Sequence, residues 1–442
     1  MTAASQYGVV FCGGGPAATG VVLCAAAEGR LVDLLSQGVC IVEQDSAIGP
    51  GGLVHYPISA NTRGGSFLRC LEALPSEAGL GSARADPSTD DLARLRHVFP
   101  RLPLVGRHLE NVGRAVHAAV ASAAGCAVLT EHTVQDVQLL ASGGVAVSSM
   151  PAKGSPPVTV VSERAVIAMG GTPRTRLEDL SLLPGLDLAT CADRLCHAVA
   201  LLDDRSELPP HLRRSVVDAG EAVVVGGSHS AWSAAWMLVH DPRLRSADGR
   251  PPRVTVLHRS PLRFFFRDVA RARAAGYAFD EVRDVCPRTG MVNRHGGLRA
   301  DAHALAWAAT HQERGEGPVR AVALVDEPES RAAARRALDG AGAVIAGIGY
   351  EPNVPSLRRP DGSPLRLATS ETGALVTDQA RLVTTEGTVL PELLAFGLGS
   401  GLPATGELAG EPSYAGRLDA VSLYQAEVGR IVLETLLGSA HS

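Results

Sequence analysis

The fold is decided by a stretch near the start of the chain, Tyr7-Gly-Val-Val-Phe-Cys-Gly-Gly-Gly-Pro-Ala-Ala18. Its first half is apolar and predicts a buried β-strand, and its second half is a glycine-rich turn that opens a helix. A second buried strand, Val39-Cys-Ile-Val-Glu43, follows and ends in a carboxylate. The order of strand, glycine turn, helix, strand and acid is typical of a dinucleotide-binding domain.

The glycine turn predicts a site for a diphosphate. Positions without side chains let the backbone approach a pyrophosphate, and the start of the helix supplies N–H groups and partial positive charge. An acid at the end of the next strand can accept hydrogen bonds from ribose hydroxyls. A tight structural turn that binds nothing is the alternative. The residues expected to contact the nucleotide are Gly13, Gly15, Pro16, Ala17 and Glu43.

A second, more degenerate copy of this pattern lies in the middle of the chain. The strand Glu221-Ala-Val-Val-Val225 leads into the turn Gly226-Gly-Ser-His-Ser-Ala231, and Arg259 rather than an acid follows the next strand. An arginine would pair with a ribose 2′-phosphate that a carboxylate would repel, so the pattern favours NADP over NAD. A helix-capping histidine and an ordinary surface arginine are the alternatives. The expected contacts are Gly226, Ser228, His229, Ser230 and Arg259.

Length and composition narrow the class of protein. At 442 residues the chain is too long for one hydrophobic core, and 45% hydrophobic with 20% charged residues indicates a globular protein. A net charge of −5 and an aromatic content of 4% disfavour binding to nucleic acid or to an anionic membrane. The eight cysteines include no C-x-x-C pair and no common zinc spacing. Because a signal-peptide start is also missing, we expect a cytoplasmic protein without a metal site.

Between and after the two copies, further strands complete the pattern. Short strands separated by turns occupy about residues 127–161, and apolar strands ending in glycine follow at Ala165-Val-Ile-Ala-Met-Gly170 and at 343–350. The sequence thus predicts an α/β fold with two Rossmann-like dinucleotide-binding domains and a β-meander. We expect domain segments at 1–175, 176–345 and 346–442, the middle one being an insertion that splits the first domain.

This arrangement resembles the flavoproteins with two dinucleotide-binding domains, which bind FAD in the split domain and NAD(P)H in the inserted one. Ala168-Met-Gly170 is similar to the A-T-G that ends a strand of their first domain, and Gly347-Ile-Gly-Tyr350 is similar to their A-T-G-Y. Their last strand ends in G-D, whereas this chain has Phe396-Gly-Leu-Gly399. The flavin-side contacts that the resemblance implies are Gly52, Gly170, Gly349, Tyr350, Gly399 and Ser413.

Within that superfamily, the chain resembles the flavin-dependent N-hydroxylating monooxygenases of the ornithine and lysine hydroxylase type, which belong to class B. Phe279-Asp-Glu281 with Pro287 is similar to the family's F-x-N-E-x-F-x-P stretch, and Val292-Asn293-Arg294 falls where the family has T-N-Y. This resemblance implies FAD and NADPH as cofactors. It also implies that a flavin C4a-hydroperoxide hydroxylates the nitrogen of a small amine or amino-acid-like metabolite.

The same resemblance implies three catalytic candidates. Asn293 corresponds to an asparagine near nicotinamide and substrate, and His55 and Asn61 follow a turn that lies close to the flavin ring in the superfamily. Ordinary turn and loop packing is the alternative for each. The expected partners are a small-molecule substrate and dioxygen, in a possible homo-oligomer. An NAD(P)H:acceptor reductase or an oxidase without oxygen insertion, and a vestigial flavoprotein without activity, are the alternative functions.

One cluster in the insert combines aromatic and basic side chains, namely residues 263–267, in which three phenylalanines stand between Arg263 and Arg267. It could form a lid over a bound adenine. An apolar anchor for the insert is the expectation that we prefer, because contiguous phenylalanines bury a large apolar area.

Overall fold

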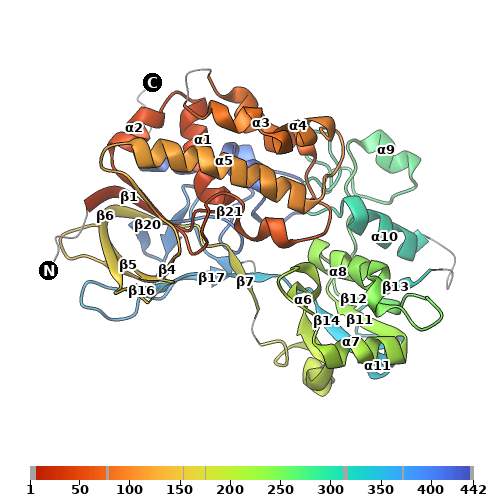
Figure 1. The fold of residues 1–442 in the computed structure, drawn as a ribbon. Helices are drawn as coiled ribbons and strands as arrows, with labels where there is room; N and C mark the ends of the chain where they lie inside the picture. The colour runs from red at the N-terminus through yellow and green to blue at the C-terminus, as the bar shows by residue number, and fades with distance from the viewer. Residues whose placement is uncertain are drawn as a thin grey trace.

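The computed structural model describes residues 6–75, 79–152, 154–174, 176–311, 317–370 and 373–438. It contains two large β-sheets, of nine and five strands, and each carries packed helices. Figure 1 shows the two sheets in separate halves of the molecule, the second with strands drawn in colours from green to light blue. The predicted fold class, α/β with two Rossmann-like domains and a β-meander, is confirmed.

The first sheet carries the first glycine turn. Its strand β1 (Gln6–Cys12) lies between β2 (Val39–Val42) and β6 (Val158–Ile167) and runs parallel to both. Val10, in the middle of β1, pairs with Cys40 of β2. Because this part of the sheet is covered on both faces, its strands are continuous apolar runs rather than alternating ones.

The meander continues the sheet beyond β6. Strand β5 (Val145–Pro151) pairs antiparallel with β6 on one side and with β4 (His132–Leu139) on the other. The sequence predicted separate strands before and after residues 162–164, but β6 is unbroken there. It stays extended because it pairs with β1 and β5 at once. The remaining strands are β3 (Ala127–Leu129), β16 (Ser356–Arg358), β19 (Arg381–Val383) and β20 (Val389–Ala395).

Helices cover one face of the first sheet, as Figure 1 shows for α1 and α5 above it. Phe11, Val116, Phe396 and Val432 are each less than 2% exposed in the core between helices and sheet. Among the described residues, no helix is long and apolar enough to span a membrane. The helices of this half are α1 (Pro16–Ala27), α2 (Leu31–Ser36), α3 (Gly64–Ala73), α4 (Pro87–Arg94), α5 (Leu102–Ser122), α12 (Val421–Tyr424) and α13 (Glu427–Leu437).

The inserted half is a second parallel sheet in the order β10-β14-β11-β12-β13. Trp232, which is fully buried, belongs to the core between this sheet and its helices. The strands are β10 (Leu195–His197), β11 (Glu221–Val225), β12 (Arg253–His258), β13 (Val319–Ala323) and β14 (Ala343–Ala346). The helices are α6 (Val199–Leu202), α7 (Pro210–Ala219), α8 (His229–His240), α9 (Val269–Ala274), α10 (Ala300–His311) and α11 (Pro328–Gly340).

The two halves are joined by a pair of short strands. β7 (Gly171–Pro173) and β15 (Tyr350–Pro352) run antiparallel, and the Asn353 N–H donates to the carbonyl oxygen of Gly170 at 3.0 Å. The predicted segment boundaries lie near these strands, although residue 175 itself is outside the described residues. The exact boundaries stay a prediction.

A buried histidine makes the helical layer sensitive to pH. His108 of α5 is 0% exposed, its Nδ1 lies 3.0 Å from the hydroxyl of Thr89, and burial lowers its pKa from 6.5 to about 4. The unfolded chain therefore binds a proton that the folded chain excludes. We expect the contribution of His108 to stability to fall as pH drops from 6.5 towards 4, with a limiting slope of about 1.4 kcal/mol per pH unit. Urea unfolding at several pH values measures this slope. His108→Gln is expected to flatten it, and an equal slope in the variant would contradict the assignment.

Candidate active site

The first glycine turn begins with a backbone conformation that only glycine fits. Gly13 has φ +100°, and a Cβ there would lie 2.5 Å from the carbonyl oxygen of Ala168. The Gly14 N–H donates to Glu43 Oε2 at 2.7 Å, which ties the turn to the end of β2. The turn is therefore shaped by contacts within the protein, before any ligand is considered.

Gly15 differs from its neighbours because it faces open space. A Cβ at Gly15 would meet only the Cα of Gly51, at 3.9 Å, and its φ of −68° is one that any residue adopts. Helix α1 begins at Pro16 with no side-chain cap and no acid in its first turn. The partial positive charge of the helix start is thus free to face an anion beside Gly15.

The acid that ends β2 is buried at the same place. Glu43 is 7% exposed, its Oε1 accepts from the Asp45 N–H at 3.0 Å, and burial raises its pKa. Each carboxylate oxygen keeps further acceptor capacity, because a backbone N–H uses one lone pair. Glu43 can therefore accept hydrogen bonds from a ribose while it holds the turn.

A single cavity of about 990 Å³ connects the two glycine turns. Its walls come from both halves of the molecule, and its end at β1 is the open space beside Gly15. This open turn, the uncapped helix start and the acid fit an FAD. The predicted residues that line the cavity are Gly13, Gly15, Pro16, Ala17, Glu43, Gly52, Asn61, Gly170, Ser228, His229, Ser230, Gly349, Tyr350 and Gly399.

The second turn repeats the geometry of the first with a serine at its exposed point. Gly226 has φ +131°, and a Cβ there would collide with the carbonyl oxygen of Gly347 at the end of β14. Ser228 precedes α8, whose start has no side-chain cap and no acid in its first turn. Gly226 shapes the turn from outside the cavity, and Arg259 is exposed just beyond β12.

Asn293 lies away from the cavity, inside the insert. It is 0% exposed, and its Nδ2 donates to the Phe264 carbonyl at 3.1 Å and to the Tyr277 hydroxyl at 3.0 Å. Phe264 is itself 3% exposed and packs edge-on against Trp307, so the phenylalanine run contributes to the core of the insert. The catalytic role of Asn293 stays a prediction.

Ser413 is turned to the insert. Its hydroxyl donates to Asp284 at 2.6 Å, and its carbonyl oxygen accepts from Arg263 at 2.9 Å. It is absent from the cavity lining. These bonds fasten the C-terminal part of the first half to the insert, and a flavin contact for Ser413 stays a prediction.

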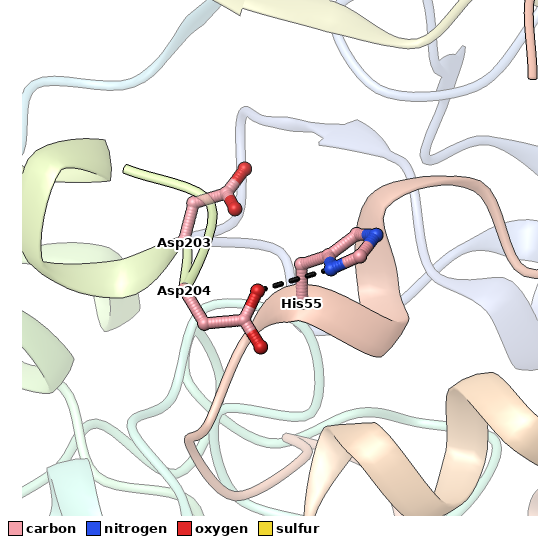
Figure 2. A group of neighbouring side chains, drawn as sticks. All are labelled: His55, Asp203 and Asp204. Carbon is pink, nitrogen blue, oxygen red and sulfur yellow. Dashed lines mark hydrogen bonds and ion pairs between the residues drawn. The ribbon is translucent and has the colours of Figure 1, made fainter. Parts of the chain in front are cut away.

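His55 joins the predicted flavin turn to the insert. It ends the short helix η1 (Gly51–His55), its Nδ1 lies 3.0 Å from Asp204 Oδ1, and its carbonyl oxygen accepts from the Asp204 N–H at 2.7 Å. Figure 2 shows the imidazole turned toward Asp204 while the Asp203 carboxylate points away. Asp203 pairs with Arg205 at 2.7 Å instead. Although the three groups lie within 4.8 Å of one another, both acids already have partners.

Several lining residues carried no signal in the sequence. Arg205 lies in the cavity wall as the partner of Asp203, and Arg417 and Asp419 come from the segment before α12. The Arg417 guanidinium donates to the Gly401 carbonyl at 3.1 Å. None of these three residues belongs to a local sequence motif. The fold brings them to the cavity from distant parts of the chain. Tyr56, by contrast, lines the cavity and stands just after the turn at Gly52 that the sequence predicted.

Two glycine turns, each following a strand with parallel neighbours in its own sheet and both reaching one cavity, define the fold of the flavoproteins with two dinucleotide-binding domains. No protein-family model matches the sequence. The chain is 35% identical to the CMP-5'-(3-aminopropyl)phosphonate hydroxylase of Streptomyces rubellomurinus over 452 residues, a match that covers 98% of each chain. The chain belongs to the family of this hydroxylase, and it is a flavin-dependent enzyme, as the sequence predicted.

Solved structures share the fold over nearly the whole chain. Ornithine hydroxylase PvdA of Pseudomonas aeruginosa matches with a TM-score of 0.58 at 13% identity, covering 98% of this chain and 99% of that one. The FAD-bound cadaverine monooxygenase DfoA of Erwinia amylovora matches with 0.58 at 11%, covering 98% and 94%. Ornithine N-hydroxylase KtzI of Kutzneria sp. 744, with reduced FAD, NADP+ and L-ornithine, matches with 0.52 at 16%, covering 97% and 99%. The predicted resemblance to N-hydroxylating flavin monooxygenases is confirmed. Of the predicted cofactors, FAD is bound in the DfoA and KtzI structures and NADP+ in the KtzI structure.

Proposed function

We propose that this protein is an FAD- and NADPH-dependent monooxygenase that hydroxylates the nitrogen of an amine. The observation that carries the proposal is the single cavity of about 990 Å³ lined by both glycine turns. A hydride donor at the second turn can reach a flavin at the first only if the two share one space. The family relationship to a hydroxylase supports oxygen insertion as the outcome.

Each half of the chain has its own part in this scheme. Gly15 and the start of α1 hold the FAD diphosphate, and Glu43 accepts from its ribose. The start of α8, with Ser228 and Ser230, holds the NADPH diphosphate. The reduced flavin, when bound, supplies electrons to dioxygen so that one oxygen atom can be inserted into the substrate.

The remaining task of the protein is to position the substrate amine and to exclude water from the cavity. Tyr56 and Tyr350 interact through their hydroxyls in the cavity wall, and burial raises the pKa of both, so they stay neutral at physiological pH. The amine must enter as the neutral base, because only its free lone pair can attack an electrophilic oxygen. The proposal places the enzyme in the cytoplasm, with a small-molecule amine and dioxygen as its partners.

The substrate that we propose is an amine carried on a phosphonate. The relative named above is a hydroxylase of a nucleotide-linked 3-aminopropylphosphonate, and the match to it is end to end. L-Ornithine and cadaverine, named for two structural neighbours, are the comparison amines.

Turnover with these amines tests the proposal. The protein, loaded with FAD, is given NADPH, dioxygen and one amine at a time, and NADPH consumption, hydrogen peroxide and the product mass are measured. We expect the phosphonate-linked amine to gain one oxygen atom in step with NADPH consumption. If with every amine the NADPH that is oxidised is matched by hydrogen peroxide formed from dioxygen, the enzyme is an oxidase. If NADPH is instead oxidised only when a quinone is added as electron acceptor, the enzyme is a reductase.

A further inference from the structure

One arginine of the insert stands in the wall of the cavity with part of its guanidinium unused. Arg205 follows α6 and lines the cavity that connects the two glycine turns. We infer that Arg205 donates to the diphosphate oxygens of the FAD, so that the insert holds this cofactor together with the first glycine turn. The inference rests on the part of the proposed function that places FAD at the first turn. It adds a contact that the proposed function lacks, because there the first half alone holds the FAD.

A buried acid fixes one edge of the Arg205 guanidinium. Asp203 is 6% exposed, and its two oxygens accept from Nε of Arg205 at 3.1 Å and from Nη2 at 2.7 Å. Asp203 Oδ1 also accepts from the backbone N–H of Arg205 at 2.9 Å. This forked pairing holds the plane of the guanidinium in place, so the side chain loses little freedom when it binds a further anion.

The other edge of the same guanidinium is available to a ligand. A guanidinium has five N–H bonds, and the pair with Asp203 uses one on Nε and one on Nη2. Among the described residues, nothing accepts from the remaining N–H bonds on Nη1 and Nη2. The Arg205 side chain is 51% exposed and lines the cavity. Arg205 can therefore offer two parallel donors to a group with several oxygens.

The segment that carries Arg205 is bonded to the short helix η1 of the first half. The Asp204 N–H donates to the His55 carbonyl oxygen at 2.7 Å, and Asp204 Oδ1 lies 3.0 Å from His55 Nδ1, the contact drawn in Figure 2. His55 ends η1, and Asp204 is the residue before Arg205. These two contacts therefore set the position of Arg205 relative to η1.

The start of η1 lies between Arg205 and the first glycine turn. A Cβ at Gly52 would lie 3.8 Å from Arg205 Nη2, and a Cβ at Gly51 would lie 3.3 Å from Cδ of Pro16, where α1 begins. Neither glycine has a side chain that would separate the guanidinium from the start of α1. A diphosphate has two phosphoryl groups, so one can face the start of α1 while the other faces Arg205.

The contacts of Arg205 favour the diphosphate of FAD over that of NADPH, which has the same chemistry. They lead through Gly52 and η1 to the first glycine turn. In the described part of the chain, no hydrogen bond or ion pair joins Arg205 to the second turn or to α8. The experiment below measures both cofactors.

A pair with the same geometry lies elsewhere in the insert and provides a matched control. Asp241 is 8% exposed, accepts from the Arg243 N–H at 2.9 Å and pairs with the Arg243 guanidinium at 2.8 Å. Arg243 belongs to the short helix η4 (Pro242–Leu244) and is absent from the cavity lining. Loss of either arginine thus leaves a buried aspartate without its partner, but only Arg205 lies where a cofactor can bind.

Titration of the protein without flavin tests the inference in the absence of turnover. Flavin fluorescence gives the Kd of FAD, and displacement of FAD gives the Kd of ADP, which carries a diphosphate but no flavin. We expect Arg205→Gln to weaken both on the order of tenfold, with a smaller loss at high salt. Arg243→Gln should leave both Kd values unchanged. Calorimetric titration of the FAD-loaded proteins with NADP+ should show no change in either variant, and thermal unfolding compares the effect of the two substitutions on the fold.

A double variant separates a direct contact from the effect of an unpaired acid. Arg205→Gln leaves the Asp203 carboxylate without its partner, and that negative charge by itself repels a diphosphate. Asp203→Asn combined with Arg205→Gln removes both charges at once. We expect the double variant to bind FAD and ADP as weakly as Arg205→Gln does.

The outcomes distinguish this inference from the proposed function. The inference is overturned if Arg205→Gln or the double variant binds FAD as tightly as the wild type does, if FAD but not ADP binds more weakly, or if only NADP+ binding weakens. The proposed function stands in each of these cases, because the wild type still binds FAD. If FAD and ADP both bind more weakly as expected but the wild type hydroxylates no amine, the proposed function fails while the inference stands.

Discussion

Gly15→Val is expected to weaken FAD binding on the order of a hundredfold while the protein without flavin keeps its thermal stability. A Cβ at this position meets no protein atom closer than 3.9 Å, and the backbone there is already extended. The valine side chain would instead fill the space beside the start of α1 that the diphosphate needs. Fluorescence titration with FAD gives the affinity, and calorimetry of the apo-protein gives the stability.

A neighbouring glycine is the matched control. At Gly14 a Cβ would lie 2.5 Å from the Ile48 side chain, so Gly14→Val is expected to destabilise the fold whether or not FAD is present. If Gly15→Val bound FAD as the wild type does, the diphosphate would lie elsewhere and the assignment of the first turn would be wrong.

Ser230→Glu is expected to raise the KM for NADPH on the order of a hundredfold and to leave the FAD content unchanged. Ser230 lies in the first turn of α8 and lines the cavity, so a carboxylate there would repel the NADPH diphosphate. A helix start favours an acid, so the folded protein should lose no stability. The rate of flavin reduction under anaerobic conditions, measured against NADPH concentration, gives the effect.

Ser230→Gln separates charge from size at this position. The glutamine has the same shape as the glutamate without its charge, so it should raise the KM for NADPH far less. Equal effects of the two variants would mean that steric blocking, not the anion site, accounts for the loss. If neither variant changed the KM for NADPH, the assignment of the NADPH site to the second turn would be wrong.

The parts of the site that the sequence predicted are those built from neighbours along the chain. Gly13, Gly15 and Glu43 belong to one strand–turn–helix–strand unit, and contacts within that unit explain the residue type at each position. The same holds for Ser228 at the start of α8. Such units have a small set of geometries, so the residue pattern is enough to predict a nucleotide beside them.

The parts that could not be predicted depend on contacts between distant segments. Arg299 donates to the carbonyl oxygen of Asn61, a residue of the cavity wall that lies more than two hundred positions earlier in the chain. Arg205 enters the wall as the partner of Asp203. Asn293 matched a family motif, but its amide points into an aromatic cluster. Tertiary packing decides which way each of these side chains points, so the spacing of residues along the chain could not predict it.

The central claim is that a flavin at the first glycine turn receives electrons from NADPH at the second. The most direct measurement mixes the FAD-loaded protein anaerobically with NADPH and follows the yellow absorbance of oxidised flavin. We predict that the colour is lost, that dioxygen restores it, and that the Ser230→Glu variant loses the colour only at much higher NADPH concentration. A protein that takes up no FAD supplied in excess, or whose bound flavin stays yellow under NADPH, would contradict the account.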